Sequence, residues 1–281
     1  MNLGILFGIL SMLSWGSADF FAKLLVDRIG PYRALIYSYV FGVIPLIIWY
    51  LFFPMKFTMT FFIVSIMLLG VLFNALGYIF LYKAIELEKI SLVSPIVATN
   101  PIIIVILGLV LLNEIITIPQ AIGIILAVTG LVLISMSKKK VDFTDTKGII
   151  LGFSTMIMWG LAIFMIGYIV KLTHWLFAAL WWRLLTWVFS LLTFKVKRFK
   201  LKLPKFSLLW LLIIVGVLDM CGTVLYNAGV SIGYISIIGP VAALFPVVTV
   251  VLAGIFLKEK LYGIQKSGVG LILIALVFLS I

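Results

Sequence analysis

The sequence predicts an all-α integral membrane protein whose ten transmembrane helices form two inverted five-helix repeats. Three observations carry this prediction. The 281-residue chain is 65% hydrophobic and only 11% charged, too little charge to cover a soluble protein of this length. Its two halves carry the same prolines, glycines and glutamates at a nearly constant shift. Lysines and arginines gather in alternate gaps between apolar runs.

Ten apolar runs are long enough to cross a hydrocarbon core of roughly 30 Å, which takes about 20 residues per helix. The first half gives spans at 3–25, 31–53, 60–82, 90–112 and 118–136. The second half gives spans at 148–170, 174–194, 206–230, 234–257 and 261–281. We expect a first repeat over 1–136, a polar connecting loop at 137–147 and a second repeat over 148–281.

The distribution of positive charge predicts the orientation. One face receives the large majority of the cations, among them Arg28, Arg33, Lys83, Lys89, Lys138, Lys139, Lys140, Lys147, Lys258, Lys260 and Lys266. The loop after the second helix is nearly uncharged around Lys56, whereas its counterpart at 195–205 is strongly basic. Equivalent loops therefore lie on opposite faces, as inversion across the membrane requires. The basic face should be cytoplasmic in the plasma membrane, with both termini extracytoplasmic.

The fourth span of each half carries a matched pair of prolines, with Pro95 on Pro240 and Pro101 on Pro246. A proline inside a helix removes one backbone hydrogen bond and clashes with the preceding turn. We expect these four residues to bend or break their helices and to act as hinges or gates. Static kinks are the alternative, because membrane helices carry more proline than soluble ones.

Two charged residues, Asp219 and Arg183, lie about midway along predicted spans. Each costs at least ~2.5 kcal/mol at a helix centre, so each is a candidate for substrate or proton binding. A buried ion pair that only holds helices together is the competing interpretation. The repeat partner of Asp219 is the neutral Asn74, so the two halves are not functionally equivalent.

Other polar and aromatic side chains at depth are candidate cavity residues, with helix packing as the alternative for each. They are Asn74, Tyr78, Tyr82, Asn100, Tyr226, Asn227 and the matched tryptophans Trp15 and Trp159.

Four further charged residues are assigned simpler roles. Asp19 and Lys23 stand four apart, which predicts a local helical ion pair near the cytoplasmic end. Glu114 and Glu259 follow apolar runs, which favours interfacial positions, with gating as the alternative.

Several classes of function are disfavoured. A single cysteine and a single histidine, Cys221 and His174, predict no metal site and no disulfide framework. We expect no cofactor. The basic segments are short and lack interleaved aromatic residues, which argues against a nucleic-acid partner. Hydrolase and metalloprotease motifs are missing, so we expect no enzyme.

The matched motifs resemble the drug/metabolite transporter superfamily, specifically its EamA-type ten-helix proteins. The resemblance rests on Trp-Gly in each first span, two prolines and a closing glutamate in each fourth span, and Gln-x-x-Gly in each fifth span. It implies a secondary carrier of small metabolites with a central cavity between inverted halves. The arginine common in the second helix of a half is matched by Arg183 alone, and the aligned first-half position is about Tyr39.

The sequence therefore predicts a secondary transporter that moves an amino acid-like or organic cation-like metabolite by alternating access, in export or exchange. We expect the first, third, fourth, sixth, eighth and ninth spans to form its cavity. Protons are a candidate coupling ion, and the chain is expected to be a monomer or homodimer in the bilayer. A channel or a non-transporting scaffold is the alternative, with an intramembrane enzyme less favoured.

Overall fold

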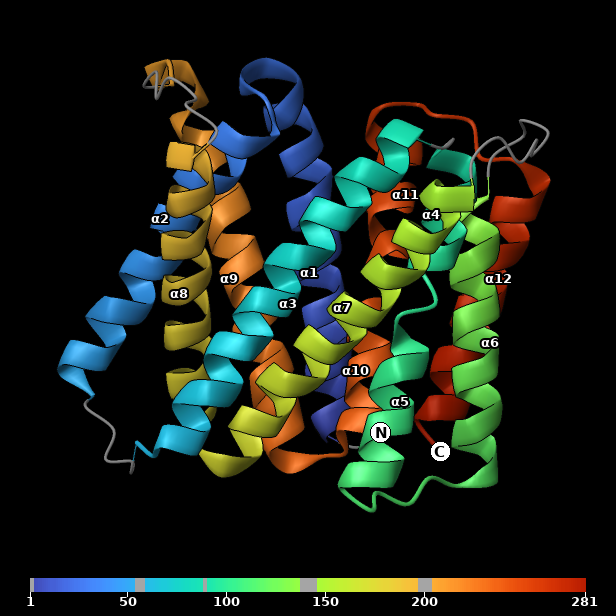
Figure 1. The fold of residues 1–281 in the computed structure, drawn as a ribbon. Coiled ribbons are helices and arrows are strands. Elements are labelled where there is room, and N and C mark those ends of the chain that lie inside the picture. Colours follow the sequence, from blue (N-terminus) through green and yellow to red (C-terminus); the bar gives the residue numbers. More distant parts are fainter. Residues whose placement is uncertain (1–2, 54–58, 88–89, 137–145, 197–203) are drawn as a thin grey trace.

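The computed structural model describes residues 3–53, 59–87, 90–136, 146–196 and 204–281, with the backbone alone at 31–32, 82, 85–86, 90–92 and 193–196. All regular structure in these ranges is helical (Figure 1). The first half contains α1 (Leu3–Ile29), α2 (Pro31–Phe52), α3 (Phe61–Leu87), α4 (Ile90–Val97), α5 (Pro101–Leu111) and α6 (Ile118–Ser135). The second half contains α7 (Thr146–Leu172), α8 (Trp175–Val196), η1 (Phe206–Leu208), α9 (Leu209–Ile232), α10 (Ile235–Ala243), α11 (Phe245–Phe256) and α12 (Gly263–Leu279).

The helix lengths confirm an all-α membrane protein. Among the described residues, nine helical stretches are long and apolar enough to cross a bilayer, counting α4 with α5 and α10 with α11 as one stretch each. The last apolar helix, α12, is shorter at 17 residues. The loop around Lys56, most of the basic segment at 195–205 and most of the predicted connecting loop at 137–147 lie outside the described residues.

The fourth span of each half is broken just before its second proline. Pro101 and Pro246 each stand in the first turn of a new helix, where a missing N–H costs nothing. Before each break the chain forms tight turns, such as Asn100 N to Val97 O at 3.1 Å and Leu244 N to Val241 O at 3.2 Å. Pro95 and Pro240 instead lie inside α4 and α10, which continue through them.

The two halves interlock through equivalent helix pairs. The most extensive packing joins α1 with α9, α3 with α7 and α6 with α12, and each of these pairs takes one helix from each half. In Figure 1, α1 rises from the lower edge, where the N-terminus lies, while α7 descends from the upper edge. Each half is therefore packed mainly against the other rather than folded by itself.

Small residues allow this close approach at matched positions. The indole of Trp15 covers Gly222, where an added Cβ would lie only 2.6 Å from Trp15 Nε1, and Trp159 covers Gly77 in the same way at 2.5 Å. Ser11 Oγ donates to the carbonyl of Gly222 at 2.8 Å. A side chain at Gly222 would push α1 away from α9, and a side chain at Gly77 would push α7 away from α3.

The two ends of the bundle are packed differently. The largest hydrophobic core lies toward the end where α7 and α9 finish and α8 and α10 begin, and it includes Val170, Phe177, Val230 and Ile235. At that end α5 packs on α10, whereas α4, the repeat partner of α10, packs mainly on α6 and α7. Among the described residues, this end therefore has the largest hydrophobic core, whereas the other end has smaller ones, such as the cluster around Leu25, Leu211 and Leu212.

Candidate functional site

A cavity of about 620 Å³ opens between α1, α2, α3, α8 and α9. It is lined by the second half of α1, the first half of α2 and the distal part of α3, so it reaches from mid-bundle toward the end that carries Arg28 and Arg33. Its volume lies in the range of sites that enclose small molecules. The lining residues are Ala18, Asp19, Ala22, Val26, Ala34, Leu35, Ile36, Ser38, Tyr39, Val71, Asn74, Ala75, Tyr78, Ile79, Lys83, Thr186, Phe189, Ser190, Val215 and Asp219.

The set of helices around the cavity differs from the predicted one. The second and seventh spans, α2 and α8, contribute lining residues, and among the residues described here the fourth, sixth and ninth spans contribute none. The physical reason is the packing of α10 and α7, whose side chains are used by the core that seals the other end.

An ion pair forms the inner wall of this cavity. Arg183 Nη1 and Nη2 both donate to Asp219 Oδ2, at 2.7 and 2.6 Å. Arg183 is only 2% exposed and the Asp219 side chain 30% exposed. Its guanidinium also stacks over the ring of Tyr39, with Cζ 4.4 Å from the centroid. The positive charge is thus neutralised and covered, while Asp219 lines the cavity and its Oδ1 accepts no hydrogen bond among the described residues.

The missing side chain of Gly42 lets the helices pack closely around this ion pair. An added Cβ at Gly42 would lie 2.9 Å from Arg183 Nη2 and 2.8 Å from the carbonyl oxygen of Gly216. Glycine at this position therefore lets α2 approach both α9 and the guanidinium. Tyr39 lies on α2 three residues before Gly42, so the arginine stacks on a residue close to the first-half position with which it aligns approximately.

Asp19 does not form the local ion pair that its spacing predicts. Lys23 instead donates to Glu259 Oε1 at 2.6 Å, which leaves Asp19 in the wall of the cavity. Within the described part of the chain, Asp19 makes no hydrogen bond or ion pair. The prediction was wrong because Glu259, a tertiary partner in the loop after α11, competes better for Lys23 than a residue one turn away.

The remaining predicted site residues divide into two groups. Asn74 and Tyr78 line the cavity. The side chain of Tyr82 lies outside the described residues. Five others lie away from this cavity, namely Asn100, Tyr226, Asn227, Trp15 and Trp159.

Most of these five make contacts between or within helices. Tyr226 Oη donates to Ile163 O at 3.0 Å, and Asn227 Nδ2 donates to Trp175 O at 3.0 Å. Asn100 Nδ2 donates to Val97 O at 3.0 Å, next to the helix break. Trp15 Nε1 donates to the carbonyl oxygen of Asp219 at 3.2 Å, whereas Trp159 Nε1 is buried without a partner among the described residues.

Sequence reasoning missed several lining residues on α8. Thr186 and Ser190 follow Arg183 at helical spacing, so all three lie on one face of α8. Thr186 is buried and its Oγ1 has no partner among the described residues. The sequence could have revealed them, because Thr186 and Ser190 stand three and seven residues after the charged Arg183, and this spacing puts all three on one face of a helix.

The two matched glutamates have unlike surroundings. Glu114 is 8% exposed and accepts the backbone N–H groups of Ile235 and Ser236 at 2.8 Å each. Its carboxylate therefore caps the N-terminus of α10, where the helix dipole favours negative charge. The Glu259 side chain is 50% exposed and pairs with Lys23. Glu114 is thus no simple interfacial residue.

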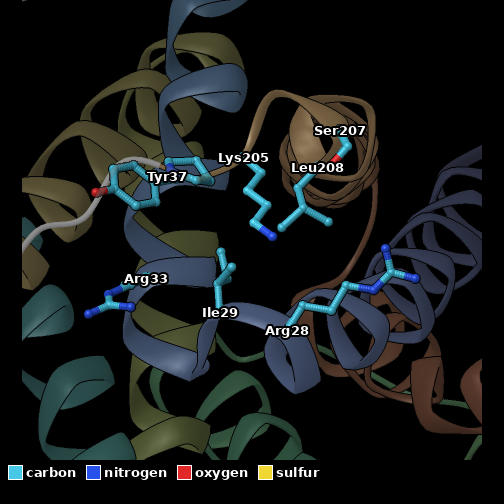
Figure 2. A pocket seen from close by; sticks show the side chains of 8 residues that line it. Arg28, Ile29, Arg33, Tyr37, Lys205, Ser207 and Leu208 are labelled. Atoms are coloured by element: carbon cyan, nitrogen blue, oxygen red, sulfur yellow. The ribbon is translucent and has the colours of Figure 1, made fainter.

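A second, shallower pocket of about 430 Å³ lies where α2 begins and η1 precedes α9 (Figure 2). It is lined by Arg28, Arg33 and Lys205, among others. In Figure 2 the guanidinium groups of Arg28 and Arg33 point away from each other and from the centre of the pocket. These cations do not converge on one point, so the pocket has no anion-binding geometry.

The fold and the enclosed cavity define a multi-pass integral membrane protein of transporter type. The chain belongs to the EamA-like transporter family, whose model matches residues 2–136 and 146–281. Each half of the chain is thus one copy of the family unit, and the membership supports a transporter of small solutes rather than an enzyme.

Two similar proteins are informative about architecture. An uncharacterised protein of Methanocaldococcus jannaschii is 30% identical over 141 residues, which cover 49% of this chain and 99% of that protein. That relative is therefore about as long as one half of this chain. A solved structure described only as the crystal structure of a protein has a TM-score of 0.82 and 15% identity, covering 99% of this chain and 98% of the other. This likeness concerns the fold alone.

Proposed function

We propose that the protein is a secondary transporter that moves a small amino acid-like or organic cation-like metabolite across the cytoplasmic membrane by alternating access, in export or exchange. The observation that carries the proposal is the difference between the two glutamates. Glu114 holds the N-terminus of α10, while Glu259, its repeat partner, is paired with Lys23 of α1. Matched elements of the two halves thus occupy different states in one molecule.

The two halves are proposed to be inverted across the membrane. The opposite directions of α1 and α7 in Figure 1 support this. Lys83, which lines the cavity toward its open end, belongs to the cation-rich face, and this supports a cytoplasmic position for that end. The cavity then faces inward, and the sealed core lies on the extracytoplasmic side. Both termini lie on that outer side as well.

The proposed cycle exchanges the roles of the two glutamates. To open outward, Glu114 releases the N–H groups of α10, and α5 separates from α10. To close inward, Glu259 leaves Lys23 and caps α4, and α4 packs on α11. The breaks before Pro101 and Pro246 allow each half-helix to tilt without bending its partner, which is the hinge role proposed for the prolines. Because one capped helix replaces another, the two states have similar energies, as a carrier requires.

A carrier is favoured over the alternative of a channel. The core around Val170, Phe177 and Ile235 closes the far end of the cavity, and Lys171 Nζ adds a hydrogen bond to Gly233 O at 2.7 Å on that side. A channel would need a continuous path in one conformation. The cavity that the described residues line ends at mid-depth instead.

A reversible disulfide tests this proposal. A Cβ at Gly239 would lie 3.6 Å from Ile104 Cβ, close to the ideal separation for a disulfide. In a Cys221→Ser background, Ile104→Cys with Gly239→Cys should lock α5 to α10. The transported solute would first be selected by a thermal-shift screen of amino acids, sugars, nucleosides and quaternary amines.

Oxidation should abolish exchange of that solute in proteoliposomes, and dithiothreitol should restore it. The single-cysteine variants Ile104→Cys and Gly239→Cys, oxidised in the same way, are the controls and should keep their activity. Unchanged exchange with complete cross-linking would contradict alternating access.

A further inference from the structure

Asp19 is a carboxylate in the wall of the cavity for which the described residues provide no hydrogen bond or ion pair. It lies in the part of α1 that faces α9, one helical turn beyond Trp15, whose indole donates to the backbone of Asp219. Its side chain is exposed to the space of the cavity rather than covered by neighbouring helices. Lys23, the nearest cation on its own helix, is held by Glu259.

The other charges around the cavity do not neutralise Asp19. Arg183 is already paired with Asp219 and is almost wholly buried behind it. Lys83 lines the cavity near the end of α3, toward the open end rather than at mid-depth. Among the described residues, no cation is therefore positioned to pair with the Asp19 carboxyl group in the deep part of the cavity.

A second carboxylate lines the same cavity. The Asp219 side chain is 30% exposed, and its Oδ1 accepts no hydrogen bond among the described residues. This oxygen is therefore available to a donor from a bound molecule. The remaining wall is largely apolar or aromatic, as with Ile79 and Phe189.

We propose that Asp19 binds the protonated amine of the transported substrate, with Asp219 Oδ1 as a further acceptor and the apolar wall enclosing the rest of the molecule. A primary ammonium group has three donors, so it can donate to both carboxylates. An anionic substrate would meet two carboxylates and is excluded from this position. The inference rests on the proposed transport function and narrows it to amine-bearing substrates.

Two probes with the same apolar part and opposite charges on the end group test the inference in a binding measurement, without a transport assay. Phenethylamine and 3-phenylpropionate share a ring and a two-carbon chain, and one ends in an ammonium group and the other in a carboxylate. Isothermal titration of the purified protein should show binding of phenethylamine and none of 3-phenylpropionate. Tighter binding of the carboxylate would overturn the proposal.

Variants then assign the charge to its residue. Asp19→Asn should weaken phenethylamine binding about 10- to 100-fold, the usual effect of losing a charge-assisted hydrogen bond. Asp19→Glu should keep binding within about 5-fold. The matched control is Asp27→Asn, the same change on the same helix at a residue that does not line the cavity, and it should bind as the wild type does.

Folding does not obscure the result. Asp19→Asn removes a lone charge at depth, so its thermal midpoint should equal or exceed that of the wild type. A folded Asp19→Asn protein with wild-type phenethylamine affinity would sink the proposal. Binding without exchange in proteoliposomes would instead refute the transport function while leaving the amine site intact. If Asp19→Asn exchanges a solute as fast as the wild type does, the transport function stands and the amine site at Asp19 is refuted.

Discussion

The helix α10 and its repeat partner α4 carry the same pattern of a proline near the middle and a break before the next helix, yet they lie in different surroundings. All nine residues of α10 are buried, and Glu114 caps its N-terminus. In α4, Val93 and Val97 are buried, whereas Ser94, Pro95 and Ile96 are partly exposed. One pattern is therefore compatible with a closed and an open arrangement, and the difference is set by tertiary contacts rather than by local sequence.

The largest expected effect concerns the charges that only the second half possesses. Asp219→Asn leaves Arg183 buried without a counter-charge and should destabilise the protein by about 3–5 kcal/mol. The matched first-half change, Asn74→Ala, removes a residue for which the structure shows no hydrogen bond in the described ranges, and it should cost less than about 0.5 kcal/mol. Unfolding in a series of denaturing detergent concentrations measures the loss of stability in each variant. Equal losses would contradict the claim that the two halves differ at this position.

A double variant separates the structural from the functional role of that pair. Replacing both partners by Leu removes both charges together, so stability should recover to within about 1 kcal/mol of the wild type. Exchange in proteoliposomes should stay lost if Asp219 also contacts the substrate. Recovery of both stability and exchange would show that the pair only holds helices together.

A medium effect is expected at the two glutamates. Glu114→Gln loses the charge at the N-terminus of α10 and should shift the equilibrium about 10-fold toward the outward-open state, since about 1.4 kcal/mol of preference is lost. Glu259→Gln breaks only a half-exposed pair with Lys23 and should leave the inward-open state almost unchanged. Spin-label distances between the outer ends of α5 and α10 report the shift. Identical responses in the two variants would argue against a latch at Glu114.

A smaller effect separates the two matched tryptophans. Trp15→Phe removes the hydrogen bond to the carbonyl of Asp219 and should destabilise the protein by about 1 kcal/mol. Trp159→Phe removes a buried N–H that has no partner in the described ranges, so it should be neutral or slightly stabilising. Thermal midpoints of the two purified variants test the difference in sign. A larger loss for Trp159→Phe would mean that its indole finds a partner in another state.

The smallest effect is a pH dependence at the start of α8. His174 Nδ1 accepts the N–H of Leu176 at 3.2 Å, whereas Gly30, which precedes α2 in the first half, offers no side-chain cap. Burial lowers the pKa of His174 below its ordinary value of 6.5. Its contribution to stability is therefore complete above pH 6.5 and is lost as the pH falls through the folded-state pKa.

The loss should be less than about 1 kcal/mol, because His174 is only partly covered. Thermal midpoints between pH 8 and pH 5 measure it. His174→Asn keeps a capping side chain that does not titrate, so its profile should be flatter than that of the wild type. Parallel profiles would assign the pH dependence to other groups.

Much of the fold followed from the sequence because hydrophobic length and charge distribution act locally. The spans and the helix breaks at Pro101 and Pro246 were predictable. For Asp219 and Arg183 the sequence indicated two functional candidates at membrane depth and left open whether they pair, which the structure shows that they do. The isolation of Asp19 was not, because it depends on Lys23 reaching Glu259 from a distant segment. Nor does the sequence indicate which end of the bundle is closed, since both fourth spans carry the same motif.

Cross-linking at two equivalent positions tests most directly whether the halves exchange states. In a Cys221→Ser background, Ile104→Cys with Gly239→Cys joins α5 to α10, and the repeat-matched pair Ser94→Cys with Thr249→Cys would join α4 to α11. We predict that the first pair forms a disulfide when Glu114 is intact. Glu114→Gln should decrease the yield of that disulfide and increase the yield of the second one. If the second pair never cross-links, in either background and with or without phenethylamine, the two halves do not alternate.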